Sequence, residues 1–582
     1  MTKKTAVIFF LLLLVNPLPI CFAGAYAVVS ANRHATETGI KILDEGGNAA
    51  DAAIAMAFVL GVTEPQNSGL GGGGMFLYYD HARNTYSLID YMPTAPLNAK
   101  DHDYKPQRKT EESKKEAKTG PLSVAVPGFV MGMEMIKKRF GTLEWEALLA
   151  DAINLAENGY PVSKLLLSDI NGQKERLKDQ KNFDEFFIAP LDTKKPVLVQ
   201  KNLALTLNKI AEGGAETFYW GALSQTLVKE LGDAGSLITE EDLKSYRAHD
   251  RKPKTIYYKD KIIITADLPS LGGEILEHLF KSAIEKNCDP KSPQYSSFIE
   301  KELIAFYEQK NAAINSGRAK TEKDTETQEA TNTDTETKTD TETKTDTETN
   351  TDTDPKTKTD TDTDSDTKTK TDKTSETKKN TKAQKNTNTN EAVPFGETTH
   401  ISVVDADGNI ASMTNTLNDF FGSGVVLPGL GIVMNSAMED YFLFSSNDHA
   451  AEIEKGNRPL NHLTPTMVIK DFFPLLVIGT SGGTTIPVNI FHVMYRGFAN
   501  GENLKAAIKA PKFYSFPLKK MSVYEKGFSK KLLPRQVKLI LKESTTPAGN
   551  IQALSKDAKS IKVYSDPRGE GVGMVKATKE KK

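Results

Sequence analysis

Cysteine is scarce in this chain of 582 residues, which contains two, Cys21 and Cys288. We expect residues 1–23 to be removed as a leader, and Cys288 would then be the single cysteine. A single cysteine forms neither an intrachain disulfide nor a zinc–thiolate cluster. The folded protein is therefore expected to be held together by packing alone.

An excess of charge of one sign is also missing. Lys and Arg number 74 against 76 Asp and Glu, which gives a formal net charge of −2. This balance excludes the broad basic face of a dedicated nucleic-acid-binding protein. Long apolar runs are missing too, since none approaches the roughly 18 residues that a membrane-spanning helix needs. We therefore predict no transmembrane segment.

The first 23 residues have the three parts of a secretory signal. Lys3 and Lys4 give a basic start, Ala6–Val15 is a short apolar run, and the small residue Ala23 ends the segment. This order is typical of a leader that is cleaved during export. We therefore predict a periplasmic or secreted protein.

Val, Ile, Leu, Met, Phe and Tyr are all absent from Ala319–Ala392, which approximates a repeat of Thr-Asp-Thr-Glu-Thr-Lys. Such a segment buries too little apolar surface to offset the entropy of ordering, about 1–2 kcal/mol per residue. We predict that this tract is disordered, and a solvated spacer is favoured over a dedicated binding tail.

The rest of the chain alternates between patterns typical of helices and of strands. The segment 49–60 is apolar around nearly its whole circumference, so it is predicted to be a buried helix. The predicted helices are 36–45, 49–60, 129–139, 143–158 and 203–212. The predicted strands are 75–79, 86–91, 262–266, 399–404, 410–416, 466–470 and 475–479.

Thr398 stands at an unusual junction, because a predicted strand begins there a few residues after the low-complexity tract. A threonine hydroxyl can attack the preceding carbonyl carbon and form an ester, which water then resolves. The freed threonine carries an α-amine with a pKa of about 8 beside its hydroxyl, and this amine can act as a base. A threonine that begins a strand is also an ordinary β-former. The residue alone leaves both interpretations open.

The sequence around Thr398 closely resembles the maturation site of the γ-glutamyltranspeptidases. The shared residues there are Thr398–Asp405 and Asp407–Asn409. Further matches follow in the family's order along nearly the whole folded chain, which makes the resemblance highly specific. They are Glu45–Ala53, Pro65-Gln66, Gly69–Gly74, Val126–Gly128, Gly235–Thr239, Glu241–Leu243, Arg458–Leu460, Glu525–Phe528 and Ser565–Arg568.

The resemblance implies an N-terminal-nucleophile hydrolase with an α+β fold. This fold is a four-layer αββα sandwich of two stacked, mostly antiparallel sheets flanked by helices. One precursor would cut itself between Glu397 and Thr398 into a large subunit, residues 24–397, and a small catalytic subunit, residues 398–582, which stay together as a heterodimer. The insert at 319–392 precedes the cut, where a freed chain end need not be ordered.

The resemblance also carries catalytic roles onto four residues. Thr398 matches the nucleophile, both for self-cleavage and for attack on the substrate carbonyl, and Thr416 matches the threonine that supports it. Gly482 and Gly483 match the glycines whose backbone N–H groups form the oxyanion hole. Glycine lets the main chain approach a tetrahedral intermediate closely, and the loss of one such donor typically costs about 3–4 kcal/mol.

Substrate-binding roles fall on four further residues. Asn418 and Asp440 match residues that hold the α-amino group of the donor, and a carboxylate facing an ammonium is a charge-assisted pair. Asn461 and His462 stand where the family usually has two serines. Both can hydrogen-bond, and a protonated His462 could attract a carboxylate.

Two further departures from the family pattern concern the same end of the substrate. Family members usually carry an arginine followed by a glutamate where this chain has Met92 and Pro93, and that arginine clamps the substrate α-carboxylate. Methionine cannot replace a bidentate guanidinium. The stretch from Asp440 to Arg458 is also shorter than in members with a full lid. We therefore predict weakened or redirected selectivity with an unchanged reaction class.

Two other features have simpler interpretations. Gly71–Gly74 lacks the Lys-Ser/Thr pair of a phosphate-binding loop, so it does not indicate nucleotide binding. His400 and His462 are poor metal candidates because no spacing joins them to a ligand set. Neither a metal nor an organic cofactor is predicted.

The expected function is a self-processing γ-glutamyltransferase and glutathione hydrolase. Glutathione is the leading donor, and water or an amino acid or peptide is the acceptor. One alternative is an acylase of the same fold that acts on another amide, such as poly-γ-glutamate or an acylated β-lactam. The other alternative is a catalytically silent exported scaffold.

Overall fold

The structure is a computed structural model. It describes residues 24–99, 118–191, 193–315, 397–442, 455–471, 473–517, 521–528, 538–542, 549–557 and 560–577. The predicted leader, the predicted disordered tract and most of the predicted short lid lie outside the described residues. Among the residues described, no helix combines the length and apolar character needed to cross a membrane.

A seven-stranded sheet in which all neighbouring strands are antiparallel carries the candidate nucleophile. In spatial order its strands are β20 (Val572–Ala577), β1 (Ala25–Ser30), β9 (Glu397–Val404), β10 (Ile410–Asn418), β2 (Gly73–Asp80), β3 (Thr85–Asp90) and β6 (His249–Arg251). The strand β9, which contains the predicted cut between Glu397 and Thr398, therefore lies between β1 and β10 inside the sheet.

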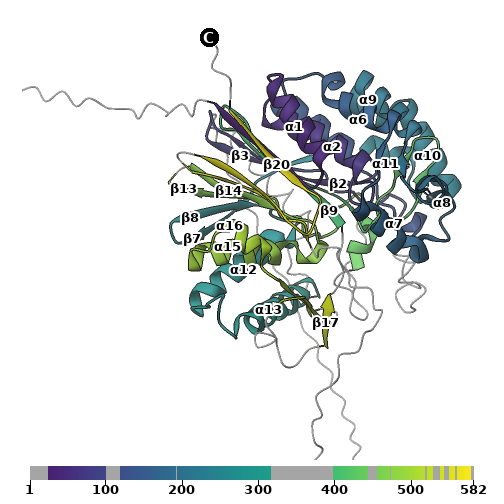
Figure 1. Cartoon of the computed structure of the whole chain (residues 1–582). Helices are drawn as coiled ribbons and strands as arrows, with labels where there is room; N and C mark the ends of the chain where they lie inside the picture. The colour runs from purple at the N-terminus through teal and green to yellow at the C-terminus, as the bar shows by residue number, and fades with distance from the viewer. Residues whose placement is uncertain are drawn as a thin grey trace, which may run out of the picture. The chain divides into compact units, whose positions relative to one another are not determined.

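A second antiparallel sheet of six strands stacks against the first (Figure 1). Its strands in order are β19 (Ile561–Ser565), β18 (Gln552–Lys556), β14 (Phe473–Gly479), β13 (Thr466–Lys470), β8 (Lys261–Thr265) and β7 (Lys254–Tyr258). Apolar side chains that alternate along the strands fill the space between the sheets. Ala27, Val29 and Val404 of the first sheet meet Val468 and Ile478 of the second in one core.

One layer of helices covers the outer face of the first sheet (Figure 1). It contains α1 (Arg33–Asp44), α2 (Ala49–Thr63), α5 (Phe129–Phe140), α6 (Trp145–Asn158), α7 (Lys164–Leu177), α8 (Lys181–Phe187), α9 (Lys201–Tyr219), α10 (Ala222–Ala234) and α11 (Glu240–Ser245). Every residue of α2 is buried, as its uniformly apolar sequence predicts. Asn48 and Asp51 close its first turn with a capping box.

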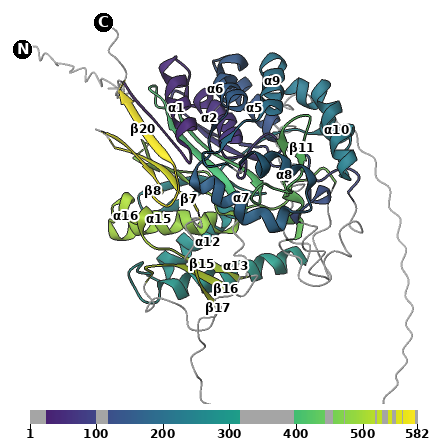
Figure 2. The same cartoon turned by 45° about the vertical axis from the view of Figure 1, so that its right-hand side comes forward.

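A second layer of helices covers the outer face of the six-stranded sheet. It contains α12 (Leu271–Glu285), α13 (Tyr295–Asn315), α15 (Ile486–Asn500) and α16 (Leu504–Lys509). Figure 2 shows a small sheet beside α13, built from β15 (Phe513–Phe516), β16 (Met521–Glu525) and β17 (Lys538–Lys542). Helices, two sheets and helices form four layers, which confirms the predicted α+β sandwich.

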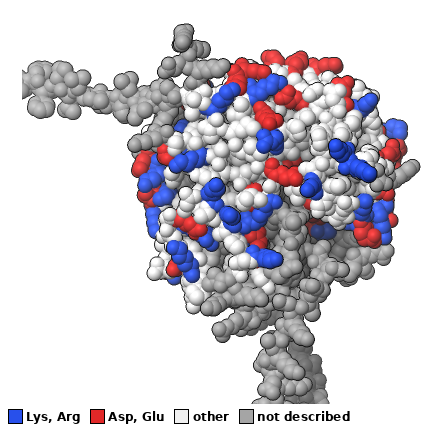
Figure 3. Space-filling model, viewed as in Figure 1, with Lys and Arg blue, Asp and Glu red and all other residues white. Residues whose placement is uncertain are grey.

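Two predicted boundaries differ from the structure. The helix predicted at 203–212 begins two residues earlier, at Lys201 of α9, and its predicted end agrees with the non-helical backbone at Gly213 and Gly214, beyond which a second helical stretch runs to Tyr219. The strand after the low-complexity tract begins at Glu397, one residue earlier than predicted, because Glu397 pairs with Asn418 across a register shift in β10. The surface in Figure 3 shows Lys and Arg interspersed with Asp and Glu on the visible face.

Candidate active site

Thr398 and Thr416 are cross-strand partners on β9 and β10, and both are buried. In a strand, alternate side chains share a face. Val404 and Ile410 point into the core between the two sheets, and Thr398 and Thr416 have the same parity as these two residues. The two threonines therefore lie side by side on the inner face of the first sheet.

A β-bulge after Thr416 shapes the end of β10. The register shifts between Thr416 and Asn418, and Asn418 adopts a left-handed backbone with a φ of 82°. The backbone N–H of Asn418 donates to the Thr416 hydroxyl oxygen at 2.8 Å. A hydroxyl that accepts such a bond can at the same time donate its own hydrogen. This geometry fits a supporting role of Thr416 toward the neighbouring Thr398.

The glycine run before β2 lets several chain segments approach this end of β10. A Cβ atom on Gly72 would lie 2.2 Å from the Thr416 carbonyl oxygen, and one on Gly73 would lie 2.5 Å from the Tyr91 carbonyl oxygen. A Cβ on Gly71 would lie 2.1 Å from the Val433 carbonyl oxygen. Close backbone packing therefore requires glycine at these positions. The glycine run is explained by this packing and needs no nucleotide-binding role.

Gly482 and Gly483 form a tight turn between β14 and α15. Their φ angles are 126° and 53°, in the region that favours glycine. The backbone N–H and the hydroxyl of Thr485 both donate to the Gly482 carbonyl oxygen, at 3.0 and 2.8 Å. The turn is thus rigidly held at the positive N-terminal end of a 15-residue helix.

The strand that leads to this turn passes close to β9. A Cβ atom on Gly479, the last residue of β14, would lie 2.2 Å from the imidazole of His400. His400 shares its strand face with Thr398, so Gly479 packs on the same inter-sheet face as the candidate nucleophile. The imidazole bonds the hydroxyls of Thr414 at 2.8 Å and Ser402 at 3.1 Å. Burial lowers the pKa of His400 to about 3, so it is neutral and structural at pH 7.

Asn418 and Asp440 come together at the side of the site. Asp440 lies half-buried in a 3₁₀ segment, Ala437–Phe442, and shares a side-chain hydrogen bond with Asn418. The amide nitrogen of Asn418 also donates to the Ser436 carbonyl oxygen at 3.1 Å. Burial, and then the neighbouring Glu439, raise the pKa of Asp440 well above its usual value. A bound ammonium group would lower this pKa and so stabilise the carboxylate form of Asp440.

Two cations lie beside this pair. Lys118 Nζ is 2.7 Å from Glu439 Oε1 and 3.4 Å from Asp419 Oδ2. Arg176, from α7, donates to the carbonyl oxygen of Gly422 at 3.1 Å and to that of Phe420. The carboxyl groups of Asp419, Glu439 and Asp440 therefore share a small region with two cations. Sequence reasoning missed both cations.

Met92 lies in the core between the sheets and is fully buried. Its backbone is held at both ends, because its N–H donates to Asp90 Oδ1 at 3.0 Å and its carbonyl accepts from the Tyr246 hydroxyl at 2.9 Å. The neighbouring cations are engaged with Asp90, through Arg251 Nε at 2.7 Å and Arg458 Nε at 3.3 Å. The side chain at position 92 itself therefore offers no charge to a substrate.

Asn461 and His462 are buried and differ in what they can offer. Asn461 Oδ1 accepts from the Leu463 backbone N–H at 3.0 Å, and its Nδ2 has no hydrogen-bond partner among the described residues. His462 Nε2 lies 2.9 Å from the hydroxyl of Tyr307 on α13. Burial lowers the pKa of His462 to about 4, so the side chain carries no positive charge at pH 7.

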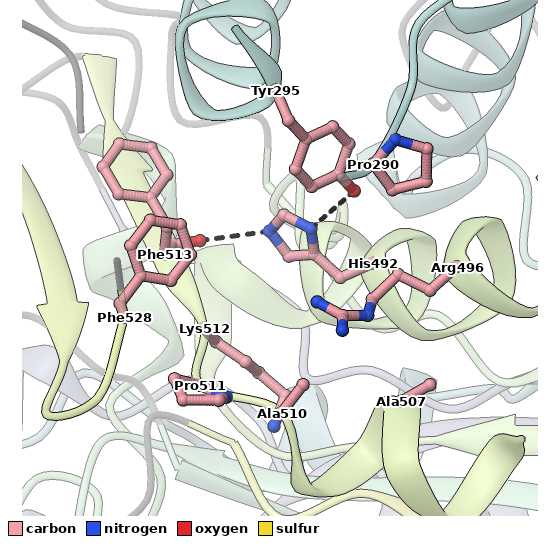
Figure 4. A pocket seen from close by; sticks show the side chains of 10 residues that line it. All are labelled: Pro290, Tyr295, His492, Arg496, Ala507, Ala510, Pro511, Lys512, Phe513 and Phe528. Atoms are coloured by element: carbon pink, nitrogen blue, oxygen red, sulfur yellow. Dashed lines mark hydrogen bonds between the residues drawn. The ribbon is translucent and has the colours of Figure 1, made fainter. Parts of the chain in front are cut away.

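A cavity of about 30 Å³ shares no residue with this site (Figure 4). His492 of α15 lines this cavity. Its imidazole is hydrogen-bonded to the Tyr295 hydroxyl through Nδ1, at 2.8 Å, and to the Phe513 carbonyl oxygen through Nε2, at 3.1 Å. The volume is about that of one water molecule. Within the described ranges, no three His, Cys, Asp or Glu side chains gather closely enough to hold a metal ion.

A buried threonine near the start of an inner strand, between two stacked antiparallel sheets flanked by helices, defines the N-terminal-nucleophile hydrolase class. The structure is similar to a cephalosporin acylase from Bacillus halodurans, with a TM-score of 0.73 over 95% of this chain and 96% of that one. The two are 23% identical, so this similarity shows the fold.

Sequence comparison gives the family within this class. The family model of gamma-glutamyltranspeptidase matches residues 35–576. The glutathione hydrolase proenzyme of Pseudomonas aeruginosa is 30% identical over 94% of both chains, and that of Escherichia coli is 31% identical over 89% of this chain and 86% of the relative. The capsule biosynthesis protein CapD proenzyme of Bacillus anthracis is 28% identical, over 96% and 91%. The chain belongs to the γ-glutamyltranspeptidase family.

Proposed function

We propose that this protein cuts its own backbone between Glu397 and Thr398 and then cleaves γ-glutamyl amides with the freed threonine. The observation that carries the proposal is the pairing of buried Thr398 with Thr416 on the inner face of the sheet. Membership of a family whose named relatives are glutathione hydrolase proenzymes supports both the processing and the donor. Glutathione is the leading donor.

The proposed chemistry uses the same hydroxyl twice. In the precursor, Thr398 Oγ1 attacks the Glu397 carbonyl carbon, and the peptide C–N bond breaks, so that an ester forms and the nitrogen takes up a proton as the free α-amine. Water then hydrolyses the ester to the Glu397 carboxylate and the Thr398 hydroxyl. That amine then takes the hydroxyl proton while Oγ1 attacks the γ-glutamyl carbonyl. The N–H groups of Gly482 and Gly483 stabilise the oxyanion. The amine part of the donor leaves, and water or an amino acid or peptide resolves the γ-glutamyl ester.

Asn418 and Asp440 are proposed to hold the α-amino group of the donor. The hydrogen bond that joins the Asp440 carboxyl to the Asn418 side chain supports this assignment, because a carboxylate that faces an ammonium forms a charge-assisted pair. At the α-carboxylate, the buried Nδ2 of Asn461 is proposed as a donor, because it lacks a partner among the described residues. The Tyr307 hydroxyl is hydrogen-bonded to His462 Nε2. This bond supports a role in which neutral His462 shapes the proposed donor site through hydrogen bonding.

A related amide is the second candidate substrate, and Met92 is the observation that favours it. Without the arginine clamp, the free α-carboxylate of a γ-glutamyl group gains less from binding, so a small donor loses more than a longer chain that makes further contacts beyond the scissile amide. A poly-γ-glutamate is such a donor, and hydrolysis would then outweigh transfer.

The two proposed subunits, residues 24–397 and 398–582, would remain a heterodimer after the cut. Strands β9 and β10 of the small subunit lie between β1 and β2 of the large one, and β20 pairs with the outer side of β1. Separation would break four strand ladders, β1–β9, β10–β2, β1–β20 and β13–β8, and expose the core beneath them. The order of features in residues 1–23 supports export.

A denaturing gel of the purified protein tests the proposal directly. We expect two bands, the smaller beginning at Thr398 by N-terminal sequencing, and release of p-nitroaniline from γ-glutamyl-p-nitroanilide. The Thr398→Ala variant should stay as one band and be inactive, whereas Thr399→Ala, on the next position of the strand, should still be cut. An uncut wild-type chain, or activity in Thr398→Ala, would refute the assignment.

Comparing donors separates the two candidate substrates. Faster release of glutamate from glutathione than from poly-γ-glutamate supports the first candidate, and the reverse supports the second. An efficiently processed protein that cleaves neither would instead indicate an acylase of the same fold with another amide substrate.

A further inference from the structure

The neighbours of the two proposed amine-binding residues meet on a single lysine. Asp419 follows Asn418 at the end of β10, and Glu439 precedes Asp440 in the 3₁₀ segment Ala437–Phe442. Lys118 Nζ lies within ion-pair distance of both carboxylates, at 3.4 and 2.7 Å. One cation therefore joins the two separate segments that carry the donor site.

The segment that carries Lys118 is itself fixed against the same region. Two residues after Lys118, the backbone N–H of Gly120 donates to the Ser423 carbonyl oxygen at 2.8 Å. Leu122 packs against a small core that contains Ala437, Met438 and Tyr441 of the 3₁₀ segment. These contacts hold the backbone near Lys118 in place, so its side chain reaches the two carboxylates from a supported position.

The ion pairs of Lys118 are partly shielded from water. About a third of the Lys118 side chain is exposed, at 34%, and the two carboxylate side chains are 20% and 23% exposed. Burial alone would lower the pKa of Lys118, but Asp419 and Glu439 raise it above its usual value, so the lysine is charged at pH 7. A charge-assisted bridge in this setting can fix geometry more firmly than a fully exposed pair.

We infer that Lys118 is a positioning residue of the donor site, which holds Asn418 and Asp440 at the spacing that receives an α-ammonium group and keeps Asp440 ionised. The inference rests on the proposed function, because it takes these two side chains as the amine-binding pair. Lys118 acts through its two carboxylate partners and need not touch the substrate. A residue in this role sets selectivity for donors that carry a free amine.

The charged groups around Asp440 predict how its pKa changes when one of them is removed. Glu439 and Asp419 raise the pKa of Asp440, whereas the Asn418 hydrogen bond and Lys118 lower it. Arg176 of α7 interacts electrostatically with Asp419 and Glu439 and donates to the Thr119 hydroxyl oxygen at 3.3 Å, next to Lys118. Removal of Lys118 should therefore make Asp440 take up a proton at higher pH, and removal of the Glu439 charge should have the opposite effect.

The test compares Lys118→Met, Lys118→Arg and Glu439→Gln in the processed full-length enzyme, with γ-glutamyl-p-nitroanilide as the probe. Lys118→Met should raise KM about three- to tenfold with little change in kcat, and Lys118→Arg should restore most of the loss. The acidic limb of kcat/KM should move up by about one pH unit in Lys118→Met and down in Glu439→Gln. A purely structural role would not move the limb in opposite directions.

Lys41→Met is the matched control, because Lys41 also pairs with a carboxylate, Asp151, at 2.7 Å but lies on α1. It should leave KM and the pH profile unchanged. A Lys118→Met enzyme with wild-type KM and an unmoved acidic limb overturns the inference. If Lys118→Met fails to fold, the Glu439→Gln variant alone tests the inference. An acidic limb of kcat/KM that does not move, or that moves to higher pH, in Glu439→Gln overturns the inference. Failure of the proposed function would show differently, as a wild-type enzyme that does not cleave the probe.

Discussion

Met92 shows how a single side chain can change the specificity of an otherwise complete site. It is fully buried between the sheets, next to Asp90, whose two arginine partners are already engaged. A thioether offers neither charge nor hydrogen-bond donors to a carboxylate. In the proposed donor site, the end that would bind the α-amine is therefore polar, whereas the end that would bind the α-carboxylate lacks the family's guanidinium.

Introducing arginine at position 92 together with glutamate at position 93 should strengthen binding of glutathione. We expect the double variant Met92→Arg, Pro93→Glu to lower KM for glutathione by about tenfold, because a bidentate guanidinium–carboxylate contact is charge-assisted and the glutamate compensates the buried charge. Steady-state kinetics with glutathione measure the change. Met92→Lys with Pro93→Glu is the control and should improve KM less, since an ammonium cannot bind in a bidentate manner. An unchanged KM in the arginine variant would mean that another group already holds the carboxylate.

At the scale of residues, the sequence did not identify the side chains that contact the proposed site residues and their neighbours. Lys118 lies some 300 positions before Asp419 and Glu439 along the chain, so only the folded structure brings them together. The sequence signal for a nearby cation was that Asn418 and Asp440 each have an acidic neighbour. Tyr307 is likewise joined to His462 across 155 positions, and a histidine motif alone does not predict that bond.

At the scale of elements, the apolar pattern predicted five helices and the two strands that carry the candidate catalytic threonines. The mostly apolar 49–60 segment is the buried α2, and the strands predicted at 399–404 and 410–416 are β9 and β10. The predicted helix end at residue 212 agrees with the non-helical backbone at Gly213 and Gly214. The helices that were not predicted are α7, α8, α10, α11, α12, α13, α15 and α16. The resemblance to a known family supplied the stacking order of the layers, which periodicity alone does not encode.

The glycine run before β2 gives a test of how tightly the elements around Thr416 pack. Gly72→Ala should block processing and lower the unfolding temperature, because the added Cβ would lie 2.2 Å from the Thr416 carbonyl oxygen, which is backbone and cannot yield cheaply. The fraction of cut chain on a gel and a thermal melt measure the two effects. Gly172→Ala, at an exposed position of α7 with no neighbour within 4 Å, is the control. It should leave processing intact and stabilise the helix by about 0.5–1 kcal/mol. Normal processing of Gly72→Ala would show that β10 can shift without harm.

At the scale of the whole molecule, three buried histidines make stability depend on pH. Burial lowers the pKa of His400 to about 3 and those of His462 and His492 to about 4. Their stabilising contribution is fully present above the unfolded pKa of about 6.5 and is lost as pH falls toward the folded values. Glu64 works in the opposite direction, because burial raises its pKa to about 7. Its contribution is present below the unfolded pKa of about 4.5 and is lost as pH rises through 7.

The free energy of unfolding should therefore fall as pH is lowered from 6.5 to 4.5. Each histidine contributes a slope of about 1.4 kcal/mol per pH unit, and half-buried His249, whose pKa is also lowered to about 4, adds a fourth such contribution. Glu64 and Asp440, whose pKa values burial raises, act in the opposite direction and leave a smaller net slope of the same sign. Urea unfolding of the uncut Thr398→Ala chain at pH 7.5, 6 and 5 measures this without the complication of two subunits. The His492→Gln variant should show a slope smaller by about one histidine's share. A urea midpoint that rises toward pH 5 would contradict the prediction.

The placement of β1 between β20 and β9 has a consequence for when the protein becomes active. The last strand of the chain pairs with the first, and the first pairs with β9, which contains the proposed cleavage site. The sheet around that site is therefore complete only when residues 572–577 have been synthesised and folded. We expect a chain that ends before β20 to be processed poorly, so that self-cleavage would report on completion of the fold.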